Sequence, residues 1–220
     1  MHMFSVLRDS WYFFSHNLLA ITRLCLPLIV LEGLFLQQVS SLAPAQSADS
    51  WRLLAGLLFY PLYSAALILF LDARSNGLQP PARDLLAAAL RLWPRFALLA
   101  AIMTLAILLG ASLYVLPGIW LIVKLAFAEY LLVLRGMPPL KALKESFAMS
   151  TGYFWPMLGC VLIVMLPLWL LDAWSQTQAS LADESLLSLL MDCTNRFLQL
   201  FSSVVLFRLF MLRSTQPDVE

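Results

Sequence analysis

Polar side chains recur at helical spacing near the C-terminal end of the sequence, inside a segment that is otherwise apolar. They recur at spacings of three or four residues and are Asp192, Asn195, Arg196, Gln199, Ser202 and Ser203. Residues at these steps share one face of a helix, so the pattern predicts a polar stripe. Such a stripe either bonds to neighbouring membrane helices or lines a hydrated path for ions and small solutes.

Ionisable residues also interrupt other apolar segments, namely at Glu32, Lys124 and Glu129. A charge at the centre of a bilayer costs about 2.5–3.5 kcal/mol on insertion scales, so each of these groups needs a partner or access to water. Asp192 and Arg196 are four residues apart and can pair on one helix face. Lys124 and Glu129 are five apart, which predicts different neighbours, and the spacing leaves open whether Lys124 meets Glu32 or Asp192.

No arrangement typical of an enzyme accompanies these residues. His2 and His16 are isolated, and the sequence contains no HExxH, no Ser-His-Asp order, no glycine-rich phosphate loop and no CxxC pair. We therefore expect no catalytic residue, no metal site and no cofactor, and a protein that is not an enzyme. Cys25, Cys160 and Cys193 lie in apolar segments and are predicted to be buried free thiols.

The composition indicates that membrane helices must position these polar groups. The chain has 220 residues, of which 61% are hydrophobic and 12% charged, against about 45–50% and about 25% in soluble domains. Its net charge of +1 gives no electrostatic reason to expect nucleic acid as a partner. We expect an all-α, polytopic membrane protein that forms a single membrane domain over residues 1–220.

Apolar runs set the number of membrane spans. A hydrocarbon core of about 30 Å requires about 20 apolar residues in a helix. The sequence predicts six spans, near residues 18–38, 52–71, 96–116, 118–134, 154–173 and 186–211. The alternative is that the fourth span, which contains Lys124 and Glu129, does not cross fully.

Basic residues indicate the orientation of these spans. Eleven of the fourteen Lys and Arg residues fall on or near the side of the N-terminus, whereas the opposite loops, SLAPAQSADS and SQTQASLADE, contain none. By the positive-inside rule both termini are predicted to be cytoplasmic.

Three short amphipathic helices are predicted on this basic side. Their apolar residues are Met3, Leu7, Trp11 and Phe14, then Leu85, Leu86, Ala89, Leu90 and Trp93, then Leu140, Leu143 and Phe147. Each helix carries basic residues and precedes an aromatic or Trp-Pro element, as a helix in the headgroup plane requires. With two spans each, they predict a parallel threefold repeat with units over about 3–75, 82–135 and 139–213. The alternative is that any cytoplasmic loop before a span acquires basic and aromatic residues.

One segment resembles a known family. The stretch VLPGIWLIVKLAFAEYLLVLRGMPPLKALKESFAMSTGYFWPML is similar to the core pattern of the YciC family of bacterial inner-membrane proteins, as is the terminal LFRLFML. Its order of features, a Pro-Gly turn, a span with one basic residue and a Ser-bearing helix, also appears in the membrane domain fused to some glycerophosphodiester phosphodiesterases. The resemblance implies a multi-pass protein of the bacterial inner (cytoplasmic) membrane, concerned with envelope upkeep, and it carries over no catalytic residue.

Two functions are compatible with these features. The first is a non-enzymatic protein that interacts with anionic phospholipids and supports envelope maintenance. A collar of basic residues would bind the headgroups at about 1 kcal/mol per residue, and its members are Arg83, Arg91, Arg95, Lys141 and Lys144. The alternative is a channel or small-solute transporter built on the polar stripe. The partners predicted are membrane phospholipids, and a homo-oligomer or an envelope protein partner is left open.

Overall fold

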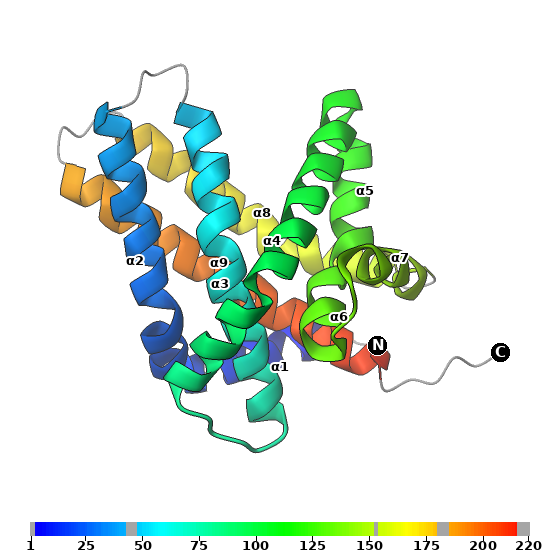
Figure 1. Cartoon of the computed structure of the whole chain (residues 1–220). Coiled ribbons are helices and arrows are strands. Elements are labelled where there is room, and N and C mark those ends of the chain that lie inside the picture. The colour runs from blue at the N-terminus through cyan, green and yellow to red at the C-terminus, as the bar shows by residue number, and fades with distance from the viewer. Residues whose placement is uncertain (1–2, 43–47, 152–153, 180–184, 215–220) are drawn as a thin grey trace.

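Helices make up all of the regular secondary structure in the part of the chain that the structure describes (Figure 1). The computed structural model describes residues 3–42, 48–151, 154–179 and 185–214. The helices are α1 (Met3–His16), α2 (Leu18–Leu42), α3 (Ala48–Ser75), α4 (Ala82–Leu113), α5 (Val115–Leu125), α6 (Ala128–Arg135), α7 (Pro139–Met149), α8 (Phe154–Ala179) and α9 (Ser185–Ser214). The all-α class expected from the composition is confirmed.

Five stretches among the described residues are long and apolar enough to cross a membrane. They are Leu18–Val39, Ser50–Ser75, Ala82–Ser112, Leu116–Arg135 and Leu190–Ser214. At about 1.5 Å of rise per residue, even the shortest of them, with 20 residues, matches a hydrocarbon core of about 30 Å. The remaining expected span falls on α8, whose described apolar part, Met157–Leu171, is shorter. The count of six therefore stays a prediction.

The two ends of the helical chain lie on the same side of the molecule. In Figure 1, α2 and α3 form one hairpin, α4 and α5 form another, and α8 and α9 run obliquely behind them. The first helix, α1, packs along α9, with the ring of Trp11 5.6 Å from that of Phe201 and an ion pair of 3.5 Å between Asp9 and Arg208. The first and last described helices therefore pack against each other.

The fourth apolar stretch is broken into α5 and α6 instead of forming one helix. Ala126 and Phe127 separate the two helices, and the hydroxyl of Ser146 on α7 bridges the break. This hydroxyl donates to the carbonyl of Lys124 at 2.8 Å and accepts from the backbone N–H of Phe127 at 3.2 Å. Ser150 also donates to the Lys124 carbonyl, at 3.4 Å. Backbone groups in an apolar setting must be bonded within the protein, and α7 supplies the bonds that the break removes.

Two of the three expected amphipathic helices are separate elements, namely α1 and α7. The remaining one, expected around residues 85–93, is not a separate helix. Residues 82–95 are the first half of α4, which continues through Pro94 to Leu113. A proline interrupts one helical hydrogen bond and bends a helix without necessarily ending it. Since the second repeat unit lacks a separate amphipathic helix, the threefold repeat is not confirmed and stays a prediction.

The faces that these two short helices bury differ from the expected apolar stripes. On α7 the buried residues are Ala142 and Ser146, whereas Leu140 is 73% exposed. On α1 the small Ser10 is buried and Trp11 is 61% exposed. Small residues allow helices to approach closely, as α7 must in order to reach the α5–α6 break. Of the expected apolar stripes, Phe14 on α1 is buried at 3% exposed, whereas Trp11 and Leu140 lie on the outer side of their helices.

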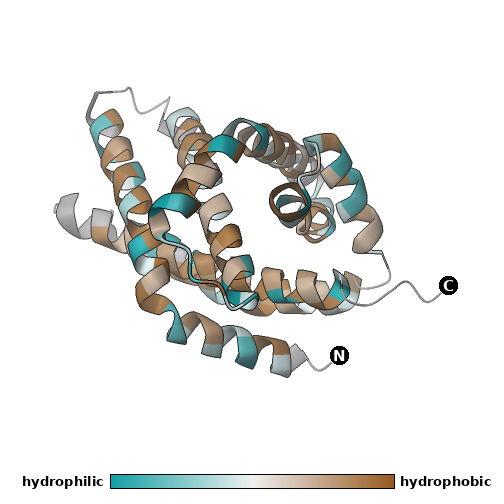
Figure 2. Ribbon diagram, turned by 60° about the horizontal axis from the view of Figure 1, so that its bottom comes forward, coloured by the Kyte–Doolittle hydropathy of each residue, from teal (hydrophilic) through white to brown (hydrophobic). Residues whose placement is uncertain are grey.

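One cluster of buried apolar residues joins helices along the chain, from α1 to α9. Tyr130 and Phe127 lie at its centre, each no more than 2% exposed, and the hydroxyl of Tyr130 donates to the carbonyl of Ser203 at 2.8 Å. Figure 2 looks toward the end of the molecule where α1 lies and shows apolar residues along most helices, with polar and apolar residues alternating along α1. The inward side of α1 belongs to the core through Val6 and Phe14, and polar residues lie between them in the sequence.

Candidate functional site

The first predicted group, Glu32, is buried against an arginine from the other end of the chain. An oxygen of Glu32 on α2 accepts a hydrogen bond of 2.6 Å from Arg196 on α9. The Glu32 side chain is 0% exposed and that of Arg196 31%. Glu32 thus meets Arg196 and not Lys124, because α2 packs beside α9 while Lys124 lies on α5.

A second predicted group, Glu129, is bonded by two side chains of α3. The hydroxyl of Tyr60 donates to one of its oxygens at 2.6 Å, and the hydroxyl of Ser64 donates to the other at 3.3 Å. The rings of Tyr60 and Tyr63 meet edge to face at 5.6 Å. The carboxylate at the start of α6 is therefore held by hydroxyl donors one helical turn apart on α3.

Lys124 has a separate set of neighbours. Its ammonium group donates to the hydroxyl of Thr151 at 3.0 Å and lies over the rings of Phe147 and Trp120, 5.6 and 5.9 Å from their centroids. Contacts of this kind between a cation and aromatic rings are worth about 0.5–2 kcal/mol. The prediction that Lys124 and Glu129 reach different neighbours is confirmed.

The polar stripe of α9 faces other helices over part of its length. Asn195 and Ser202 are buried, Arg196, Gln199 and Ser203 are partly buried, and Asp192 is exposed. The hydroxyl of Ser202 donates to the carbonyl of Gln199 at 2.6 Å, and the carbonyl of Ser203 accepts the bond from Tyr130. The bond of Ser202 lies within α9, whereas the bond from Tyr130 and that of Arg196 to Glu32 join α9 to α6 and α2.

The five collar residues are all exposed, and they lie on two helices. Arg83, Arg91 and Arg95 are on the first half of α4, and Lys141 and Lys144 are on α7. Arg83 approaches its neighbour Asp84 at 3.5 Å, with side-chain exposures of 86% and 64%. Within the described part of the chain, no ion pair or hydrogen bond links the α4 group to the α7 group.

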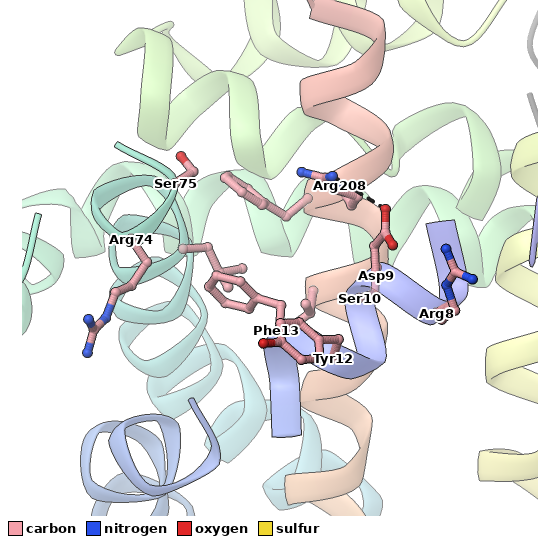
Figure 3. A pocket seen from close by; sticks show the side chains of 11 residues that line it. Arg8, Asp9, Ser10, Tyr12, Phe13, Arg74, Ser75 and Arg208 are labelled. Carbon is pink, nitrogen blue, oxygen red and sulfur yellow. Dashed lines mark ion pairs between the residues drawn. The ribbon is translucent and has the colours of Figure 1, made fainter. Parts of the chain in front are cut away.

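A pocket of about 630 Å³ opens between α1, the end of α3 and the C-terminal half of α9 (Figure 3). Its charged and polar lining residues are Arg8, Asp9, Ser10, Tyr12, Arg74, Ser75 and Arg208, and its apolar ones are Phe13, Leu71, Val204 and Phe207. In the sequence, Arg8, Arg74 and Arg208 stand out only as basic residues that indicate the orientation of the membrane spans. They are far apart in the sequence, and only the packing of α1 on α3 and α9 brings them together.

Two polar atoms around this pocket are buried without a partner among the described residues. They are the hydroxyl oxygen of Ser10 and the Nε of Arg74. The Arg74 guanidinium lies over the ring of Phe70, 5.5 Å from its centroid. Arg208 pairs with Asp9 at the long distance of 3.5 Å, and both side chains are about half exposed, at 50% and 46%. Most buried polar atoms have a partner, so the two unsatisfied atoms call for an explanation.

Comparison with known proteins identifies the family of the chain. No curated protein and no solved structure matches it. A family model described as an uncharacterised protein family, UPF0259, matches residues 36–212, which is most of the chain. The chain therefore belongs to the UPF0259 family.

Proposed function

We propose that this protein is a non-enzymatic component of the bacterial inner membrane that binds anionic phospholipids and supports maintenance of the envelope. One observation carries the proposal: on α4 and on α7, an exposed leucine lies next to an exposed basic side chain. Leu90 is 62% exposed beside Arg91, and Leu140 is 73% exposed beside Lys141. A helix surface of this kind suits the boundary between headgroups and acyl chains, where each type of side chain finds its own environment.

The proposed topology has six crossings, with α8 as the fifth of them, and both termini in the cytoplasm. The strong bias of Lys and Arg toward one side supports this orientation. The similarity of the segment around α5 to α8 to the YciC family supports the inner membrane as the location. In this arrangement the collar residues face the cytoplasmic leaflet, whose anionic lipids attract basic side chains.

Charge removal in the collar tests the proposal. Replacing Arg83, Arg91, Arg95, Lys141 and Lys144 by Gln should weaken binding of the purified protein to nanodiscs of phosphatidylglycerol, since each basic residue near such a surface contributes about 1 kcal/mol. Binding to phosphatidylcholine should change little. The control is Arg52→Gln, near the N-terminal end of α3 and outside the collar. It should leave binding to both lipids unchanged. Equal binding of the wild type and the five-residue variant to phosphatidylglycerol would contradict the proposal.

A second candidate function is the passage of ions or small solutes, and the buried Glu32 favours it. Its side chain is 0% exposed, and one of its oxygens has no hydrogen-bond partner among the described residues. Ionisable groups inside a membrane often mark a transport path. Flux into proteoliposomes that disappears with Asp192→Asn, Arg196→Gln or Lys124→Met would support transport, and flux equal to that of empty liposomes would eliminate it.

A further inference from the structure

The pocket between α1, α3 and α9 combines positive charge, unsatisfied hydrogen-bond donors and apolar walls. We propose that it binds the phosphate-bearing headgroup of one anionic membrane lipid, at a discrete site separate from the collar on α4 and α7. The inference rests on the proposed lipid-binding function and adds to it a site of fixed stoichiometry.

The charge of the pocket is the first argument. Three arginines, Arg8, Arg74 and Arg208, line it against a single carboxylate, that of Asp9, which leaves a formal surplus of two positive charges. A guanidinium offers several N–H donors in a planar fork that matches the oxygens of a phosphate. Among the described residues, no ion pair balances Arg8 or Arg74. An anion bound in the pocket would therefore supply the negative charge that balances these arginines.

The unsatisfied donors are the second argument. The hydroxyl of Ser10, a residue that is 1% exposed, and the Nε of Arg74 lack partners in the described part of the chain, and both residues line the pocket. Leaving a buried polar group unpaired costs about 1–3 kcal/mol. Phosphate oxygens accept hydrogen bonds from both hydroxyl and guanidinium groups, so a bound phosphate could satisfy them.

The apolar walls and the position of the pocket identify the carrier of the phosphate as a lipid. Phe13, Leu71, Val204 and Phe207 supply the walls, and the volume of about 630 Å³ lies within the range of about 300–1000 Å³ usual for small-molecule sites. The span of α3 ends at Ser75, which itself lines the pocket. Helix ends of this kind lie at the level of the headgroups. A free phosphate would leave the apolar walls in water, whereas a lipid places its glycerol and upper acyl chains against them.

The ion pair between Arg208 and Asp9 at the rim of the pocket provides a second test, in which lipid binding should become stronger instead of weaker. In Figure 3, Arg208 and Asp9 point toward each other, whereas Arg74 extends away from them on the other side of the pocket. The carboxylate of Asp9 repels an incoming phosphate and competes with it for Arg208. Since the pair is long and half exposed, it contributes little to stability. Removing the carboxylate should therefore strengthen lipid binding.

Native mass spectrometry of the full chain in detergent tests the proposal, with phosphatidylglycerol and phosphatidylcholine as probes. The pocket variant carries Arg8→Gln, Arg74→Gln and Arg208→Gln, and the matched control carries Arg83→Gln, Arg91→Gln and Arg95→Gln, which removes the same charge from the collar. We expect the wild type to retain one phosphatidylglycerol molecule and the pocket variant to bind it at least tenfold more weakly. The control should retain that one molecule and lose only weaker, additional lipids.

Each outcome has a distinct meaning. Loss of the single lipid from the control but not from the pocket variant overturns the pocket site and leaves the proposed function intact. Unchanged lipid binding by both variants overturns the pocket site and the proposed function together. Displacement of the lipid by millimolar inorganic phosphate as readily as by excess phosphatidylglycerol overturns the assignment to a lipid.

Two single substitutions guard against a variant that simply fails to fold. Ser10→Ala should weaken phosphatidylglycerol binding without lowering the unfolding temperature of the lipid-free protein, because the hydroxyl that it removes has no protein partner in the described residues. Asp9→Asn should strengthen binding severalfold. Weaker or unchanged binding by Asp9→Asn, or a Ser10→Ala variant that binds the lipid as the wild type does, counts against the site.

Discussion

Glu32 and Arg196 are joined across most of the length of the chain by a charged hydrogen bond of 2.6 Å. A buried ion pair is weak evidence for net stability, since both charges lose their hydration. Breaking such a pair by removing one partner is costly, because a buried charge then remains without its counterion. The pair therefore matters most as a constraint on how α2 and α9 pack.

A double-mutant cycle should reveal this coupling. Glu32→Gln and Arg196→Gln should each lower the free energy of unfolding by about 3–5 kcal/mol, whereas the double variant should lose much less than the sum, because no unpaired charge remains. Reversible denaturation in mixed micelles measures all three, with the exposed Arg91→Gln as a control. Additive losses would show that the two side chains act independently.

At the scale of the element, the break between α5 and α6 depends on a helix that follows it in the chain. The hydroxyl of Ser146 on α7 takes the place of two helical hydrogen bonds by bonding to both sides of the break. Since α7 buries only small residues at this contact, it can approach closely enough to do so. The short α7 thus fixes the relative direction of two other helices.

Removing the Ser146 hydroxyl should destabilise the junction between α5 and α6. Ser146→Ala leaves a buried backbone N–H and a buried carbonyl with fewer partners, so we expect a loss of about 1–3 kcal/mol in the free energy of unfolding. The amides that follow Phe127 should also exchange their hydrogen faster in mass-spectrometric exchange experiments. Ser112→Ala is the matched control, because the Ser112 hydroxyl is exposed and bonds only to Leu109 of its own helix. Identical exchange in the two variants would contradict the bridging role of Ser146.

The hairpin of α4 and α5 offers a second test at this scale. A Cβ atom on Gly110 would lie 2.7 Å from a methyl of Leu121 and 3.3 Å from the backbone N of Gly118. Gly110→Ala should therefore destabilise the protein by about 1–3 kcal/mol through overpacking. In contrast, a Cβ on Gly56 meets nothing within 4 Å, so Gly56→Ala should be neutral or should stabilise α3 by up to about 1 kcal/mol. Thermal unfolding of both variants compares them directly, and equal melting temperatures would refute tight packing of the hairpin.

For the whole molecule, the packing of α1 on α9 places the first and last helices at one end. In the proposed orientation, with both termini in the cytoplasm, fluorescent protein fused to either terminus should mature and alkaline phosphatase fused to either should be inactive. A fusion of alkaline phosphatase with activity at one terminus only would mean an odd number of crossings. It would also refute the proposed orientation.

Much of the architecture could be predicted from the sequence, because bilayer thickness imposes a length on every apolar helix. Each of the five stretches that are long and apolar enough to cross a membrane overlaps a predicted span, although the third begins at Ala82 and not near residue 96. The separate neighbours of Lys124 and Glu129 followed from helical geometry. These features depend on residues close together in the chain. Local spacing is sufficient to infer them.

The partners of the buried groups could not be predicted in this way. The bond of Glu32 to Arg196, the bridging by Ser146 and the pocket formed around Ser10 all join separate helices. Helical periodicity shows which face of a helix a residue occupies but not which helix lies opposite. The merging of residues 82–95 into α4 was missed for a different reason, since a proline in a sequence indicates a bend as readily as an end.

The bond between Glu32 and Arg196 has a consequence for biosynthesis. A ribosome releases Glu32 long before Arg196, because 164 residues separate them and they lie on the first and last of the five long apolar stretches among the described residues. A nascent chain that has inserted α2 therefore keeps this carboxylate without its final counterion while the intervening helices are made. The bundle can close around it only after α9 has left the ribosome, so this region assembles after the intervening helices are made and not helix by helix.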